Sequence, residues 1–269
     1  MNEINVSKQY SPNSCGLQSA DGGRTAFRAV VFAGGCAPEP EQTERFFEFF
    51  GTPDCIVAAD SGLRTCAAYA DFFSGRCALS PEAVLGDFDS LPAEELAAAR
   101  TSDAAFKAFP CDKDDTDTEL AVQYAYSRAS DCGCASPHIA VVGGDGGRID
   151  HLLNIYDSFA APQHPSVWLC REQGVWLLEA GCTAAVRNLA ASDVVSVART
   201  SAGRRGGTAA SRGLRWEAAV FRESGMPSIS NRIAPDFLSR GEPVELRAEG
   251  ADFLLVLPLH AVAEIRRAP

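Results

Sequence analysis

The sequence has few lysines and no long hydrophobic run. Lysine occurs at three positions only, Lys8, Lys107 and Lys113. None of them stands in a GxxxxGK(S/T) motif, which excludes a P-loop nucleotide site. No apolar run approaches the roughly 20 residues that cross a bilayer, so we expect no membrane-spanning segment. Residues 1–25 show no apolar core behind a basic start, so we expect no secretory signal and a cytoplasmic location.

The sequence also lacks any CxxC pair, although it contains ten cysteines. The closest approach is Cys132-Gly133-Cys134, and the other cysteines are scattered, many of them through apolar segments. Sites in which thiolates hold a metal usually need two closely spaced pairs. We therefore expect reduced thiols, mostly buried, that behave as small hydrophobic side chains.

Basic residues are outnumbered, since 35 acids stand against 24 bases and the formal net charge is −11. Phosphate backbones and anionic membranes are bound mainly through basic contacts. The charge balance therefore disfavours nucleic acid and membrane surfaces as partners. A small cationic substrate suits the negative electrostatic potential of such a protein better.

Strand-length apolar runs alternate with stretches of helical period in the first part of the chain. Strands are predicted at 28–35, 55–60, 83–90, 105–110 and 138–144, and helices at 43–51, 61–73, 91–100, 116–130 and 148–161. Continuous apolar strands between helices are typical of a parallel sheet covered on both faces. We predict an α/β, doubly wound domain with a mostly parallel, five-stranded sheet over residues 26–162, behind a flexible tail at 1–25.

Beyond Pro162 and Pro165 the pattern is that of an all-β protein. Short apolar runs recur about every ten residues and are separated by turn formers. Strands are predicted at 166–172, 175–180, 183–188, 193–199, 213–221, 227–233, 243–249 and 251–259. We predict a β-sandwich domain over residues 163–269, with a loop at 200–212.

Glycine or aspartate stands at or just after the carboxyl end of every predicted parallel strand. The residues at these ends are Gly34-Gly35, Asp60-Ser61-Gly62, Gly86 to Ser90, Asp112 to Asp117 and Gly143 to Gly147. In an open parallel sheet, ligands bind beyond the carboxyl ends of the strands. Glycines let backbone N–H groups approach phosphates closely, and carboxylates near phosphate make sense if Mg²⁺ lies between them. The helix that starts at Thr116 carries a capping box with Glu119.

Each of these signals is weak by itself. An Asp-x-Asp after a strand is often only turn or cap chemistry, and Asp114 and Asp117 could serve a helix dipole alone. Gly143 to Gly147 does not complete a dinucleotide fingerprint, because Ile149 stands where the third glycine belongs, so hydride transfer is disfavoured. His151 is more typical of a polar helix face than of a catalyst.

Taken together and in order, seven segments resemble the thiamine pyrophosphokinase family. They are VVFAGG, AADSGL, LGDFDS, DKDDTDTELA, GGDGGRIDHLLN, GLRW and SISN, over residues 28 to about 257. The resemblance implies an α/β nucleotide-binding domain and a β-sandwich domain. It also implies a homodimer with an active site at the subunit interface, and ATP, Mg²⁺ and thiamine as ligands, with AMP released.

Site residues follow from the resemblance position by position. Asp60, Asp87 and Asp89 match the metal and polyphosphate centre, with Asp117 and Arg148 as further catalytic residues. Residues that match the ATP site are Gly34, Gly35, Ser61, Asp114, Thr116, Gly144, Arg148 and Asp150. Residues that match the thiamine site are Trp216, Ser230 and Asn231. Arg232 departs from the family, which usually has an acid there.

The implied reaction is attack of the thiamine hydroxyl on the β-phosphorus of ATP. Either Asp89 or Asp117 accepts the hydroxyl proton, and the sequence does not decide between them.

Two other hypotheses remain. A Mg²⁺-dependent nucleotide phosphohydrolase or nucleotidyltransferase could use the same aspartates without thiamine. A non-catalytic thiamine- or nucleotide-binding protein is expected to have lost an aspartate of GDFDS or the Arg148-x-Asp150 pair, and both are present. For the aromatic Trp216 the alternative is a place in the sandwich core, as expected for Trp168 and Trp176.

Overall fold

The computed structural model describes residues 26–202, 206–217 and 228–267. The predicted tail at 1–25 lies outside the described residues, as does part of the strand predicted at 213–221. Among the described residues, no helix is both long enough and apolar enough to cross a membrane.

Five parallel strands form the sheet that was predicted for the first part of the chain. They are β1 (Arg28–Phe32), β2 (Cys55–Ala59), β3 (Ala83–Gly86), β4 (Ala105–Ala108) and β5 (His138–Val142). Their order is β5-β1-β2-β3-β4, with parallel pairing throughout. The inner strands are buried along almost their whole length, as their continuous apolar sequences require. β1 and β5 are neighbours although three strands and the helices α1 to α4 lie between them in sequence, so the strand order reverses between them.

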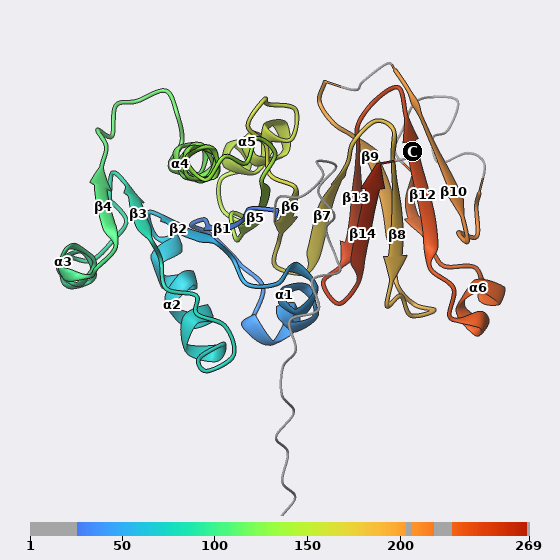
Figure 1. The fold of residues 1–269 in the computed structure, drawn as a ribbon, viewed down its shortest axis with the longest axis horizontal. Helices are drawn as coiled ribbons and strands as arrows, with labels where there is room; N and C mark the ends of the chain where they lie inside the picture. Colours follow the sequence, from blue (N-terminus) through green and yellow to red (C-terminus); the bar gives the residue numbers. More distant parts are fainter. Residues whose placement is uncertain (1–25, 203–205, 218–227, 268–269) are drawn as a thin grey trace, which may run out of the picture.

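Helices cover both faces of this sheet (Figure 1). They are α1 (Glu44–Phe50), preceded by the 3₁₀ helix η1 (Pro40–Thr43), α2 (Gly62–Phe72), α3 (Ala93–Thr101), α4 (Asp117–Asp131) and α5 (Ile149–Ser158). α4 and α5 pack on the face that carries Val31, Val57 and Val141, while α1 and α2 pack on the opposite face with Phe32 and Ile56. The arrangement is the doubly wound one expected from the sequence.

The sheet does not stop at the end of the α/β part. β6 (Val167–Leu169) pairs in parallel with β5, and β7 (Gln173–Leu178) continues the sheet antiparallel to β6. The antiparallel strands that follow are β13 (Phe253–Pro258), β9 (Val195–Arg199) and β11 (Ser228–Asn231). One hydrogen-bonded sheet of ten strands therefore runs through both parts of the molecule, from β4 to β11.

A second, four-stranded sheet packs against the antiparallel half of the first (Figure 1). It consists of β10 (Thr208–Arg212), β12 (Val244–Glu249), β8 (Cys182–Arg187) and β14 (Val262–Arg267). Residues on β8 and β12 alternate between buried and accessible, and the buried ones share a core with Leu178 and Phe253 of the large sheet. The predicted fold class, an α/β part followed by a sandwich of β-strands, is confirmed. The boundary at residues 162 and 163 stays a prediction, because the sheet is continuous across it.

Three local predictions about the sandwich were wrong or incomplete. The segment at 200–212, expected as a loop, contains strand β10. The segment at 213–221, expected as a strand, pairs only through an isolated bridge between Leu214 and Ile233 among its described residues. Strand β14 and helix α6 (Pro235–Arg240) were not predicted at all.

The cysteines that the structure describes form no disulfide, as expected, but only three of these nine are buried, so the expectation of mostly buried thiols was wrong. Each is a free thiol, and Cys55, Cys66 and Cys182 are buried. Burial raises the pKa of the Cys66 thiol to about 12, so this side chain stays neutral and inert at physiological pH.

Candidate active site

Two neighbouring parallel strands end in aspartates at the same edge of the sheet. Asp60 follows β2 and Asp87 follows β3, and these strands pair in register up to Ala59 and Leu85. The backbone N–H of Asp60 also donates a hydrogen bond to the Leu85 carbonyl, at 2.7 Å. Pairing of the two strands therefore brings both carboxylates to one place.

A strained turn adds a third carboxylate, that of Asp89. Phe88, between the two aspartates, has a φ of 60°, and Asp60 itself has a φ of 46°. Such left-handed conformations are uncommon for residues other than glycine and concentrate at functional sites. The buried Phe88 ring stacks on Phe106 of β4 with 4.4 Å between ring centroids, which anchors the turn. Carboxylate oxygens of Asp60, Asp87 and Asp89 all lie within 4.8 Å of one another.

The Asp60 carboxylate has one satisfied oxygen and one unsatisfied oxygen. Ser90 donates a hydrogen bond from its hydroxyl to Asp60 Oδ2. Asp60 Oδ1 is buried and has no hydrogen-bond partner among the described residues. A buried acceptor without a partner costs about 1–3 kcal/mol, and three adjacent carboxylates repel one another. A hard divalent cation that takes oxygen ligands, such as Mg²⁺, would remove both costs, so the donor set fits this ion.

Lys113 is a site residue that the sequence analysis missed. Its ammonium nitrogen lies 3.1 Å from Asp117 Oδ1 and 3.9 Å from Asp87 Oδ2. Its side chain is only 16% exposed. Lys113 precedes α4, so no helical spacing links it to Asp117. The rarity of lysine in this chain is the signal that could have drawn attention to it.

Asp117, at the start of α4, sits in a partly dehydrated and acidic environment. Burial raises the pKa of the Asp117 carboxyl, the hydrogen bond and charge of Lys113 lower it, and the charges of Asp87 and Asp60 raise it. The net pKa is higher than usual. A carboxylate with a raised pKa beside a metal-type cluster is a candidate proton acceptor.

The glycine turns after β1 and β5 meet where the strand order reverses. Gly144 donates a backbone hydrogen bond to the Gly34 carbonyl at 2.8 Å, and Cys36 and Asp145 form an isolated bridge. At Gly34 a Cβ atom would lie 2.5 Å from the Ser61 hydroxyl, and at Gly35 it would lie 2.9 Å from the Asp145 carbonyl oxygen. The close packing of these turns requires glycine. The crevice at such a reversal is where open α/β sheets bind ligands.

Four of the predicted ATP-site residues surround the starts of α4 and α5. Thr116 is the N-cap of α4 and forms the predicted capping box with Glu119: its backbone N–H donates to Glu119 Oε2 at 2.8 Å, and Glu119 N–H donates to Thr116 Oγ1 at 3.3 Å. Arg148, the N-cap of α5, donates two hydrogen bonds to the Asp150 carboxylate, at 3.1 and 2.5 Å. This pair is exposed, and Arg148 lowers the pKa of Asp150. Asp114 is exposed.

The residues predicted to hold thiamine lie in the sandwich. Trp216 is 59% exposed, whereas Trp168 and Trp176 are 5% and 3% exposed, so Trp216 is not a core residue and the other two are. Asn231 is 1% exposed. Its side-chain amide accepts from the Trp216 N–H at 3.4 Å and donates to the Trp216 carbonyl at 3.2 Å, which fixes the backbone of Trp216. Ser230 is exposed, with a φ of 62°.

The aspartate cluster and the Trp216 region do not meet within one chain. Strand β2 leads to Asp60, and β11 carries Ser230 and Asn231. Seven strand-to-strand steps separate β2 from β11 in the large sheet. With about 4.8 Å per step, the path along the sheet is roughly 30 Å.

Fold and site define a class: a doubly wound α/β domain with a carboxylate cluster suited to a divalent cation, joined to a β-sandwich. Within that class, residues 48–169 match the family model described as the catalytic domain of thiamin pyrophosphokinase, which confirms the resemblance to that family. The matched segment contains the three clustered aspartates, Asp117 and Arg148.

Solved structures of similar fold cover nearly the whole described chain. A thiamin pyrophosphokinase family protein from Enterococcus faecalis superposes with a TM-score of 0.62 at 20% identity, covering 87% of this chain and 99% of the other. Thiamin pyrophosphokinase from Geobacillus thermodenitrificans gives 0.61 at 20% identity, with 86% and 97% covered. The enzyme from Candida albicans gives 0.59 at 15% identity, with 87% and 89% covered. These likenesses show the shared fold. No curated protein sequence matches the chain at a significant level.

Proposed function

We propose that the protein transfers the diphosphate group of ATP to the hydroxyl of thiamine, which gives thiamine diphosphate and AMP. The observation that carries the proposal is the cluster of Asp60, Asp87 and Asp89, with oxygens within 4.8 Å of one another, inside the segment that matches the family's catalytic domain. Phosphoryl transfers need positioning and charge neutralisation more than covalent catalysis, and this cluster serves both needs.

Asp60, Asp87 and Asp89 would hold Mg²⁺, and the unsatisfied Asp60 Oδ1 supports this assignment. The bound ion would supply neutralisation of the polyphosphate charge. A hydrogen bond from the Ser90 hydroxyl holds the Asp60 carboxylate in place.

The glycine turns and the helix starts would position the polyphosphate. Backbone at Gly34, Gly35 and Gly144 lies in the crevice between β1 and β5, where it can approach phosphate oxygens closely. Arg148 presents a forked guanidinium beside it, held by Asp150. We assign Ser61, Asp114 and Thr116, at the starts of α2 and α4, to the same ATP site.

In the reaction, the thiamine hydroxyl oxygen forms a bond to the β-phosphorus while the bond from that phosphorus to the bridging oxygen of AMP breaks. The hydroxyl proton has to go to a base. Of the two candidates, Asp117 has the raised pKa that suits a proton acceptor, which favours it over Asp89. Lys113, at 3.1 Å, would keep the Asp117 carboxylate oriented.

Thiamine would bind at Trp216, with Ser230 and Asn231 beside it. A flat cationic heterocycle is attracted to an exposed aromatic face. Because this region lies far along the sheet from the aspartates of the same chain, we propose a homodimer in which the second copy completes the site. The exposed apolar side chains of Ile149, Leu153 and Ile229, between 51% and 67% accessible, support burial in such an assembly.

Incubation with ATP, Mg²⁺ and thiamine, followed by chromatographic separation of AMP from ADP, tests the proposal. We expect AMP and thiamine diphosphate in equal amounts and no turnover when Mg²⁺ is chelated. Hydrolysis of ATP that does not need thiamine would favour the phosphohydrolase or nucleotidyltransferase alternative. Binding of thiamine or ATP without any product would favour the non-catalytic one.

A further inference from the structure

Two arginines lie opposite each other beside Trp216, on the surface of the sandwich. Leu214 and Ile233 form an isolated antiparallel bridge, and both of their side chains are buried. The residues next to an opposed antiparallel pair are opposed as well, and their side chains point to the other face. Arg215 and Arg232 are these residues: the Arg215 N–H donates to the Arg232 carbonyl at 2.9 Å, and neither side chain is buried. The pair therefore presents two guanidinium groups on the outer face.

The charges of this arginine pair are not balanced within the described part of the chain. Among the described residues, no carboxylate forms an ion pair with either guanidinium, and two acids of the neighbouring segments have other partners. Glu245 pairs with Arg212 at 2.9 Å, and Glu217 accepts from the backbone N–H of Gly213. Like charges directly opposite each other destabilise an antiparallel pair. An anion bound between the two guanidiniums would remove this repulsion.

The arginine pair and Trp216 belong to one rigid surface. The buried side chain of Asn231 holds both parts, because its Oδ1 accepts from the Arg232 N–H at 2.9 Å and from the Trp216 N–H at 3.4 Å. Arg215 is the sequence neighbour of Trp216. A ligand whose ring stacks on the Trp216 indole therefore has both guanidiniums within reach.

This surface does not suit thiamine alone. The thiazolium ring is a cation, and two uncompensated guanidiniums beside it weaken its binding by repulsion. Thiamine diphosphate carries the same ring with a diphosphate group, whose oxygens accept forked hydrogen bonds from arginine. The aromatic ring and the arginine pair together fit the product of the proposed reaction better than its substrate.

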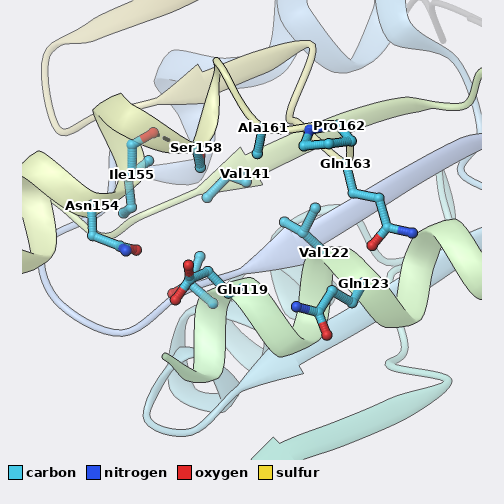
Figure 2. A pocket seen from close by; sticks show the side chains of 11 residues that line it. Glu119, Val122, Gln123, Val141, Asn154, Ile155, Ser158, Ala161, Pro162 and Gln163 are labelled. Atoms are coloured by element: carbon cyan, nitrogen blue, oxygen red, sulfur yellow. Dashed lines mark hydrogen bonds between the residues drawn. The ribbon is translucent and has the colours of Figure 1, made fainter. Parts of the chain in front are cut away.

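The pocket between α4 and α5 offers no alternative site for the diphosphate (Figure 2). Its volume is about 370 Å³, and Val122, Val141 and Ile155 form its apolar walls. The polar groups around it are mostly carboxamides, such as those of Gln123 and Gln163 at one end (Figure 2). Among the described residues, no lysine, arginine or histidine lines it, so the pocket lacks the positive charge that a diphosphate requires.

We propose that Arg215 and Arg232 form the subsite for the diphosphate that the reaction transfers, so that the sandwich binds thiamine diphosphate more tightly than thiamine. The inference rests on the proposed function, because it takes Trp216 as the thiamine surface of a homodimer. The magnesium site of one copy and the arginine pair of the other then contact the diphosphate from opposite sides. Release of the product requires that both guanidinium contacts break.

Removal of the two positive charges tests the inference with the full-length protein. Arg215→Gln, Arg232→Gln and the double variant keep polar side chains at exposed or partly exposed positions, so the fold should tolerate them. Arg187→Gln is the matched control, since Arg187 is an exposed arginine on β8 that also has no ion-pair partner among the described residues. Melting temperatures check that every variant is folded, and sedimentation velocity checks its oligomeric state.

Titration calorimetry in the presence of Mg²⁺ then compares thiamine with thiamine diphosphate. We expect the double variant to bind thiamine diphosphate more weakly by about tenfold or more, because it loses hydrogen bonds between charged groups. Its affinity for thiamine should stay within about threefold of the wild-type value, with any change toward tighter binding. Each single variant should show part of the loss, and Arg187→Gln should bind both ligands as the wild type does.

Three results would overturn the inference. The first is wild-type affinity for thiamine diphosphate in the double variant. The second is an equal loss for both ligands, which would mean that the arginines shape the surface without contacting the diphosphate. The third is dissociation of the double variant into monomers, which would assign the pair to contacts between the two copies.

Failure of the proposed function gives a different result. If the wild-type protein binds thiamine diphosphate through the arginine pair but forms no product from ATP and thiamine, the proposed function fails and the subsite stands. If it converts thiamine while the double variant keeps wild-type affinity for thiamine diphosphate, the subsite fails and the proposed function stands.

Discussion

The ammonium nitrogen of Lys113 lies 3.1 Å from the carboxylate of Asp117, and the same nitrogen is 3.9 Å from Asp87. One cation thus bridges the carboxylate proposed to accept a proton and a carboxylate proposed to hold the metal ion. Burial lowers the pKa of Lys113. The hydrogen bond and charge of Asp117, together with the charge of Asp87, raise it by more than burial lowers it, so the net pKa is above the usual value. Lys113 therefore remains charged throughout the physiological range.

Lys113→Gln is expected to tighten Mg²⁺ binding while slowing turnover. Removing a positive charge about 4 Å from Asp87 relieves repulsion of the ion by roughly 1 kcal/mol or more, about fivefold in affinity. Turnover should fall because Asp117 loses its partner. Titration of Mn²⁺ by paramagnetic resonance measures the first effect and product formation measures the second. Weaker metal binding in the variant would show that Lys113 organises the carboxylates rather than opposing the ion.

Asp87→Asn and Asp89→Asn should each remove most of the activity and leave the protein folded. Loss of one carboxylate that organises a metal ion commonly costs several kcal/mol of transition-state stabilisation. Activity measured over a range of Mg²⁺ concentrations, together with the melting temperature, tests both parts. Near-normal rates with unchanged Mg²⁺ dependence in both variants would refute the metal role.

Trp216→Ala should raise the KM for thiamine roughly 2- to 30-fold, which corresponds to the loss of a cation–π contact of about 0.5–2 kcal/mol. The KM for ATP and the melting temperature should hardly change, because the side chain is 59% exposed. Trp176→Ala is the contrasting variant: Trp176 is 3% exposed, and its truncation should cost about 3–5 kcal/mol of stability. If Trp216→Ala instead lowers the melting temperature and weakens both substrates equally, its assignment to thiamine is wrong.

The stability of the protein should fall as the pH drops from about 6.5 to about 4. Burial, reinforced by the charge of Arg28, lowers the pKa of His138 from 6.5 to about 4. The unfolded chain therefore binds one more proton than the folded protein in this window, so acid favours unfolding. The loss amounts to about 2–3 kcal/mol. Urea unfolding at several pH values checks this expectation, with His138→Gln as the control that should flatten the dependence between pH 4 and 6.5.

The sequence was most informative where the signal is local. The capping box of Thr116 and Glu119 and the continuous apolar strands predicted α4 and the five parallel strands, because caps and burial on both faces leave direct marks. Helix α6 is too short to show a helical period, and β10 was hidden in a segment rich in small residues. Sandwich strands with weak alternation are similarly hard to delimit.

Site residues were predictable by type but not by contact. Aspartates at strand ends indicated a cation site, whereas the bridge from Lys113 to Asp87 depends on how β3 and the start of α4 pack. The pocket between α4 and α5 is a gap in packing, and no sequence pattern records a gap. The link between β5 and β6, too, is visible only in three dimensions, since parallel pairing across Pro162 and Pro165 leaves no periodic mark.

The parallel pairing of β5 with β6 limits how the chain can be divided. A fragment that ends at residue 162 would expose the backbone of β5, from His138 to Val142, as a new sheet edge whose residues are almost all buried in the intact protein. A bare apolar edge of this kind recruits other strands and aggregates. Extending the fragment through β7 would only move the bare edge, because β7 is almost wholly buried and pairs with β13 in the intact protein. An expression fragment of the α/β part should therefore stay soluble only if the antiparallel strands of the large sheet are present too.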